Sequence, residues 1–136
     1  MGHGYSDDTC LLCNKKLAYG HISPYCRQHF LEQRNKEKIE RWLKSGETGC
    51  RIGTTLRNGI RQYILNSQQG KCAICGISTS WNKKPLNFVL DHIDGNAGNN
   101  FSNNLRLICP NCDSQLETFK SKNHNSARTN RRKLQK

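Results

Sequence analysis

The sequence predicts a small α+β protein that is stabilised by zinc in place of a large apolar core. The chain has 136 residues, enough for one domain or two very small ones, and its hydrophobic fraction of 34% is low for a globular protein. Small domains with thin cores usually need disulfides or metals. The sequence supplies 8 cysteines, most of them in pairs that are separated by two residues, and this spacing is typical of zinc ligands.

The expected location is the cytoplasm, without membrane attachment. The N-terminus is polar and has no apolar run of the kind found in signal peptides. No stretch approaches the roughly 20 apolar residues that are needed to span a bilayer. A reducing compartment favours zinc binding over disulfides for these cysteines.

An N-terminal zinc-binding segment is expected over residues 1–30. Cys10 and Cys13 form one pair, and Cys26 with His29 forms a second pair after a loop. Three cysteines and one histidine close a tetrahedral shell and leave no open position for water, so this predicted zinc is structural. Ordinary buried cysteines beside a coincidental histidine are the alternative, and His21 is a competing fourth ligand.

A helical linker region is expected over residues 31–70. Residues 30–45 lack glycine and proline, and residues 54–67 carry apolar residues at helical spacing, so both stretches are predicted helices. Residues 46–53 are predicted to be a turn or linker between them. Cys50 is left over once two four-ligand sites are filled, and it is predicted to be a free thiol without a role.

A second zinc site is predicted to close the segment over residues 71–123. One thiolate pair precedes an apolar strand at 86–92, and the other follows a second strand near 104–108. The intervening Gly/Asn-rich stretch is typical of a turn, so the chain must fold back on itself. A helix is expected from about 111 to 119. The four predicted ligands are Cys72, Cys75, Cys109 and Cys112.

The strand in this loop ends in an acid and a histidine, Asp91 and His92. Hydrolysis of a phosphodiester needs a group that deprotonates water near neutral pH, and histidine suits that role. A divalent cation can stabilise the charge that builds on the scissile phosphate. Asp91 and Asp113, which would lie in the first turn of the predicted helix, are therefore candidate ligands for such a cation, and Asn104 is predicted to pin the loop that carries His92.

A polyanionic partner is expected from the formal net charge of +12. Basic residues gather toward the C-terminus, and residues 124–136 are predicted to form a disordered, basic tail that contacts phosphates. A merely solvated terminus is the alternative reading of this tail. The candidate nucleic-acid contacts are Arg106, Lys120, Lys122, Arg128, Arg131, Arg132 and Lys133.

The stretch from Cys72 to about Asn123 resembles the HNH endonucleases, which are ββα-metal nucleases. The resemblance implies that His92 is the general base, that Asp91 binds one catalytic Mg²⁺ or Mn²⁺, and that Asn104 orients the loop. At the family's third position, usually His or Asn, this chain has Asp113. The whole layout, with an N-terminal zinc cluster before a helical linker, is similar to small phage-type HNH or homing endonucleases, which act on double-stranded DNA. The host cytosol would be the location for a phage-encoded member.

Two further classes of function compete with a metal-dependent DNA endonuclease. A zinc-dependent nucleic-acid-binding protein without catalysis would explain the charge and both zinc sites, and a zinc-scaffolded protein-interaction domain would explain the zinc sites alone. Neither explains why an acid and a histidine end an apolar strand inside the zinc-closed loop. The target sequence, the oligomeric state and the choice between nicking and double-strand cleavage have no signal in the sequence.

Overall fold

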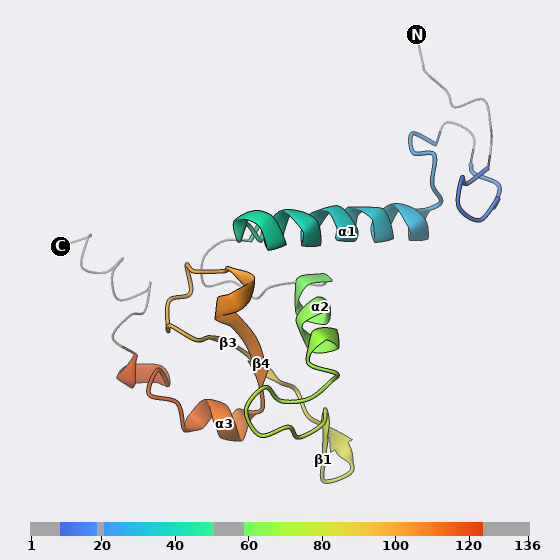
Figure 1. Ribbon diagram of the computed structural model, residues 1–136. Helices are drawn as coiled ribbons and strands as arrows, with labels where there is room; N and C mark the ends of the chain where they lie inside the picture. Colours follow the sequence, from blue (N-terminus) through green and yellow to red (C-terminus); the bar gives the residue numbers. More distant parts are fainter. Residues whose placement is uncertain (1–8, 19–20, 51–58, 124–136) are drawn as a thin grey trace. The chain divides into compact units, whose positions relative to one another are not determined.

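The computed structural model describes residues 9–18, 21–50 and 59–123 of the chain. The chain divides into two compact units, Met1–Glu37 and Lys38–Lys136. The small α+β class predicted from the sequence is confirmed: the described residues contain helices and two two-stranded antiparallel sheets (Figure 1). No helix in the described ranges has the length and apolar character that a bilayer-spanning helix needs.

In the first unit a tight turn presents the first cysteine pair. Thr9 and Lys16 form an isolated antiparallel bridge, and the backbone N–H of Cys10 donates to the carbonyl of Lys15 at 2.8 Å. Asn14 adopts a left-handed φ of 55°, which asparagine tolerates well in turns. The N–H of Leu11 donates to Pro24 at 3.0 Å and so ties this turn to the loop that leads to the second pair.

The helix α1 spans Arg27–Ser45 and α2 spans Gly59–Ser67, so both predicted helices are present in the described residues. Positions 54–58 of the predicted second helix lie outside the described residues. The left-handed Gly46 ends α1, with its N–H donating to Trp42 at 2.8 Å. At the end of α2 the N–H of Gly70 reaches back to the carbonyl of Leu65 at 2.9 Å, a bond typical of a glycine-terminated helix.

The second unit contains two hairpins. In the first, β1 (Ser80–Trp81) pairs with β2 (Lys84–Pro85) through two left-handed residues, Asn82 and Lys83, as a tight two-residue turn requires. In the second, β3 (Val89–His92) pairs with β4 (Leu105–Ile108), with Val89 opposite Ile108 and His92 opposite Leu105. The 3₁₀ turn η1 (Ser102–Asn104) leads directly into β4.

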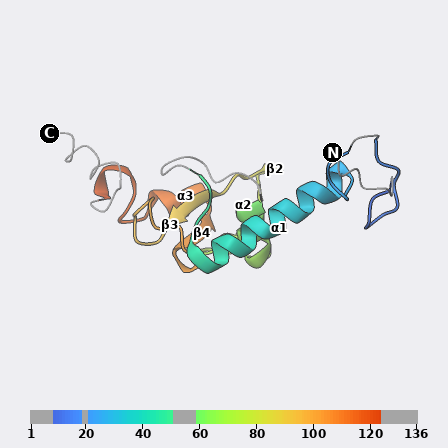
Figure 2. The same ribbon diagram turned by 90° about the horizontal axis from the view of Figure 1, so that it is seen from above.

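The short helix α3 spans Pro110–Ser114 and lies beside β3 in both views (Figure 1 and Figure 2). The predicted extent of this helix, 111 to 119, is wrong at its C-terminal end. The hydroxyl of Ser114 donates to the carbonyl of Asn111 at 2.8 Å, and Leu116 and Phe119 then make bonds to the third preceding residue. Side chains that bond the local backbone compete with helix propagation, so the chain continues as turns to the 3₁₀ segment η2 (Lys120–Lys122).

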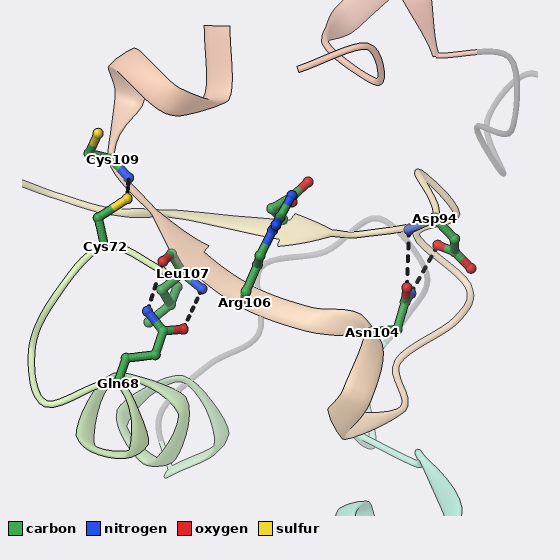
Figure 3. Close-up of polar contacts among 8 residues, drawn as sticks. Gln68, Cys72, Asp94, Asn104, Arg106, Leu107 and Cys109 are labelled. Atoms are coloured by element: carbon green, nitrogen blue, oxygen red, sulfur yellow. Dashed lines mark hydrogen bonds and ion pairs between the residues drawn. The ribbon is translucent and has the colours of Figure 1, made fainter. Parts of the chain in front are cut away.

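The core of the second unit joins the end of α1, α2, the β3–β4 hairpin and three of the cysteines. Gln68, just after α2, makes two hydrogen bonds with the outer edge of β4 (Figure 3). Its amide nitrogen donates to the Leu107 carbonyl and its amide oxygen accepts the Leu107 N–H, both at 2.8 Å. The strand therefore has bonded backbone groups at this residue on the side away from β3. The buried core residues are Trp42, Ile60, Ile64, Cys72, Phe88, Leu105, Leu107, Ile108, Cys109 and Cys112.

Candidate active site and zinc clusters

The second unit brings four cysteines together at the end of the β3–β4 hairpin. The sulfur atoms of Cys72, Cys75, Cys109 and Cys112 all lie within 4.8 Å of one another, a spacing that can hold a metal ion. The first pair sits on a turn, and the second pair follows β4 and enters α3. The backbone N–H of Cys109 donates to the Cys72 sulfur at 3.2 Å (Figure 3).

Electrostatics at this cluster favour a bound cation. Burial raises the pKa of the Cys72 thiol, but backbone N–H groups of Cys75, Cys109 and Ile74 outweigh it and lower that pKa to about 6. Burial and the neighbouring sulfurs of Cys109, Cys75 and Cys72 raise the pKa of Cys112 to about 12. One thiolate is thus stabilised by the backbone, while a further thiolate is opposed by like charge. A zinc ion would remove that opposition, because zinc binds cysteine sulfurs as thiolates, and these four cysteines would hold it.

The first unit holds a second cluster of the predicted composition. The ligand atoms of Cys10, Cys13, Cys26 and His29 lie within 4.8 Å of one another, and Nδ1 of His29 is 3.3 Å from the Cys10 sulfur. Burial raises the pKa of Cys10, but backbone N–H groups, that of Cys26 foremost, and His29 lower it to about 5. His21 is absent from the clustered ligands of the described residues, and its Nδ1 lies 2.9 Å from the carbonyl of Ser23.

Three of the predicted site residues line one cavity of about 290 Å³ in the second unit. Asp91 and His92 reach it from the end of β3, and Asp113 reaches it from α3. Lys120 of η2 also lines the cavity and brings one of the predicted phosphate contacts to it. The remaining lining residues are Leu90, Gly95, Ala97, Thr118 and Asn123.

Asp91 is held by an arginine on the neighbouring strand. Asp91 and Arg106 are partners in the β3–β4 register, and Nε of Arg106 donates to Oδ2 of Asp91 at 2.7 Å. Asp91 is only 7% exposed, whereas the arginine side chain is 27% exposed. Within the described residues no hydrogen bond to the other carboxylate oxygen is found. The pair therefore fixes the carboxylate through one oxygen and leaves the second available.

The two carboxylates at the cavity repel each other. Burial and the charge of Asp91 raise the pKa of Asp113, and the nearby ammonium of Lys120 offsets part of that rise. Two neighbouring carboxylates are a favourable setting for a cation, because a cation offsets the repulsion between their negative charges.

Asn104 does not line the cavity but anchors the loop between β3 and β4. It is 7% exposed, and its amide nitrogen donates to a carboxylate oxygen of Asp94 at 2.9 Å (Figure 3). The same nitrogen donates to the Asn99 carbonyl at 2.8 Å. Its amide oxygen accepts the backbone N–H of Asp94 at 3.1 Å. Burial raises the pKa of Asp94, but the backbone N–H of Asn96 and the amides of Asn99 and Asn104 lower it on balance.

Two contacts of this loop were not foreseen from the sequence. Asp94 is the half-buried centre of the amide network around Asn104. Asn100 was not singled out, yet its Oδ1 lies 2.9 Å from Nε2 of His92. The abundance of asparagine between residues 96 and 104 is the one sequence signal that points to such a network.

The other predicted nucleic-acid contacts divide between two parts of the chain. Lys122 is exposed on η2, close in sequence to the cavity residue Lys120. Four of them lie in the predicted tail, outside the described residues: Arg128, Arg131, Arg132 and Lys133.

Part of this chain is homologous to a phage HNH endonuclease. A stretch of 66 residues is 42% identical to the protein named H-N-H endonuclease F-TflIV of Escherichia phage T5. The match covers 47% of this chain and 29% of the relative, so the chain spans less than a third of that protein's length. No protein-family model matches the chain, and no solved structure matches it. The match supports the HNH resemblance for about half of the chain.

Proposed function

We propose that this chain is a metal-dependent HNH-type endonuclease that hydrolyses phosphodiester bonds of DNA. The observation that carries the proposal is the single cavity onto which Asp91, His92 and Asp113 open, beside a cysteine cluster that closes the hairpin. The partial identity to a phage protein named as an H-N-H endonuclease supports the same conclusion independently. The proposed module is a ββα arrangement of β3, β4 and α3.

The donor set at the cavity fits a hard divalent cation. Asp91 and Asp113 offer carboxylate oxygens, which Mg²⁺ and Mn²⁺ prefer, and their mutual repulsion would be relieved by such an ion. Arg106 occupies one oxygen of Asp91 and leaves the other for ligation. A bound cation would supply Lewis-acid stabilisation of the charge on the scissile phosphate and leaving oxygen. The two cysteine-rich clusters would hold structural zinc, because sulfur and imidazole ligands suit that ion.

The protein's own side chains would perform the remaining work. His92 would take a proton from the attacking water, and Asn104 would hold the loop that follows His92 through its bonds to Asp94 and Asn99. Lys120 at the cavity, with Lys122 and the basic residues of the tail, would contact phosphates. Arg106, predicted as a phosphate contact, is better assigned to orienting Asp91 because its Nε already donates to that carboxylate.

The test is cleavage of supercoiled plasmid by zinc-loaded protein, with and without added Mg²⁺ or Mn²⁺. We expect nicked or linear products only when the cation is added, with 5′-phosphate and 3′-hydroxyl ends. The cation should be omitted rather than removed by a chelator, because a chelator also strips structural zinc. Asp113→Asn should raise the cation concentration needed for half-maximal cleavage roughly tenfold or more. Glu117→Gln, an exposed acid on the same segment, is the matched control and should behave as wild type.

A non-catalytic nucleic-acid-binding protein is the second candidate, and the net charge of +12 favours it. The ion pair between Arg106 and Asp91 would then be a purely structural contact of the hairpin. Salt-sensitive DNA binding without cleavage at any divalent cation would establish this reading and overturn the proposed hydrolysis. Absence of both binding and cleavage would leave neither candidate standing.

A further inference from the structure

We infer that Trp42 and Asn100 are positioning residues that set the orientation and the tautomer of His92. This inference rests on the proposed role of His92 as general base. Trp42 comes from α1, far from the β3–β4 hairpin in sequence, and Asn100 comes from the loop between β3 and β4. The three residues form a chain of two hydrogen bonds that ends at the cavity.

The contact between Asn100 and His92 identifies the nitrogen that acts. Oδ1 of Asn100 lies 2.9 Å from Nε2 of His92. An amide oxygen can only accept a hydrogen bond, so Nε2 must carry the ring proton in the neutral imidazole. Nδ1 then has the lone pair and is the atom that receives the proton of the attacking water.

The contact between Trp42 and Asn100 fixes the backbone of the loop. The indole N–H of Trp42 donates to the Asn100 carbonyl at 2.6 Å. Trp42 is 1% exposed, and its ring meets the ring of Tyr63 edge-on with centroids 5.8 Å apart. Packing therefore holds the Trp42 side chain in place, and its hydrogen bond fixes the position of the Asn100 carbonyl.

The residues on either side of Asn100 are anchored as well. At position 46, directly after α1, the left-handed glycine lies under the ring of Phe101, and a Cβ there would come within 3.1 Å of that ring. Asn99 donates from its amide to Asp94 at 2.7 Å and accepts from Asn104 through its carbonyl. Three consecutive loop residues are thus each held by a different partner, which restricts the side chain of Asn100 to the direction of His92.

The kinetic test compares the zinc-loaded wild-type chain with single variants. We expect Asn100→Ala to lower kcat about 10- to 100-fold with KM within about twofold, because the DNA contacts are untouched while the base loses its orientation. Asn100→Asp keeps an oxygen acceptor and should recover at least part of the lost kcat. Trp42→Phe keeps the buried ring but removes the N–H, and kcat should fall roughly tenfold. Asn103→Ala and Trp81→Phe, both exposed positions away from the cavity, should leave kcat unchanged.

The second readout does not require activity. In ¹⁵N-histidine spectra of the wild-type chain, His92 should be in the Nε2–H form, and Asn100→Ala should shift it toward a mixture of tautomers. An Nδ1–H tautomer in the wild type would overturn the inference, as would wild-type kcat in Asn100→Ala and Trp42→Phe with zinc content retained. If Trp42→Phe fails to bind zinc or to fold, the Asn100 variants alone test whether His92 is positioned by its hydrogen bond to Asn100. If the wild-type chain cleaves no plasmid under any condition, the proposed function is refuted. The tautomer of His92 in the spectra tests the positioning contacts alone.

Discussion

Replacing His92 with alanine should lower DNA cleavage about 10²–10⁴-fold, the range that a general base usually contributes. The side chain opens onto the cavity that Asp91 and Asp113 share, and no other histidine of the described residues lines it. The substitution leaves the carboxylates, the cysteine cluster and the basic surface in place. DNA affinity and zinc content should therefore stay close to wild type while cleavage is lost, which is measured by plasmid nicking beside a binding titration.

His21→Ala is the matched control for this variant. His21 belongs to the first unit, bonds to the backbone of Ser23, and is part of neither cysteine-rich cluster. Its removal should leave the cleavage rate within about twofold of wild type. Equal losses in both variants would show that histidine removal acts through folding, and an unchanged rate in His92→Ala would remove His92 from the chemistry.

Replacing Cys109 with serine should abolish the fold of the second unit. Cys109 is buried in the core, follows β4 directly and bonds through its N–H to the Cys72 sulfur. Structural zinc sites contribute apparent binding free energies of about 10–16 kcal/mol, which exceeds the stability of a typical small domain. The variant should therefore lose its cooperative thermal transition and bind one zinc ion, against the two that we expect for the wild type, one at each cluster.

Cys50→Ser provides the comparison for cysteine replacement. Cys50 is half-buried against the same core but belongs to neither cluster, so zinc content should stay at the wild-type value and stability should change only modestly. Cys10→Ser should lose zinc from the first unit and leave the thermal transition of the second unit in place. A Cys109→Ser protein that melts as the wild type does and retains its full zinc content would exclude a stabilising metal at this cluster.

The spacing of chemically distinctive residues made the two cysteine-rich clusters and the strand-end position of Asp91 and His92 predictable. Cysteine pairs need only local turns to present two sulfurs together, so their sequence positions alone indicated which four would meet in each unit. Asp91 and His92 could be placed at a strand end because β3 is bounded by an apolar run and a Gly/Asn-rich turn. In the same way the lack of glycine and proline in α1 and the apolar spacing in α2 were enough to predict both helices.

The contacts that tune the site could not be predicted because they depend on register and long-range packing. The pairing of Arg106 with Asp91 requires the β3–β4 register, which a one-residue slip would change for every side chain. The bond between Trp42 and Asn100 joins residues that are 58 positions apart and needs the packed core to exist. The early end of α3 follows from local bonds of Ser114, which propensity alone does not weigh.

Asp113 places a second carboxylate at the cavity that Asp91 also lines. This carboxylate increases the negative charge at the cavity. Its own burial and the charge of Asp91 raise the pKa of Asp113. Lys120 at the cavity and Arg106 on Asp91 partly offset that charge. We therefore propose that DNA cleavage depends more strongly on the divalent cation than it would with a neutral ligand at position 113.

We propose that the hairpin closed by the cysteine cluster brings Asp91 and Asp113 together as ligands of a second, harder cation beside His92. The most direct measurement is a crystal structure of the zinc-loaded protein soaked in Mn²⁺, with the two metals distinguished by anomalous scattering. We expect zinc at the cysteine-rich clusters and manganese in the cavity, about 2.0–2.3 Å from a carboxylate oxygen of each aspartate. Manganese that is absent from this cavity at saturating concentration, or bound without contact to either aspartate, would contradict it.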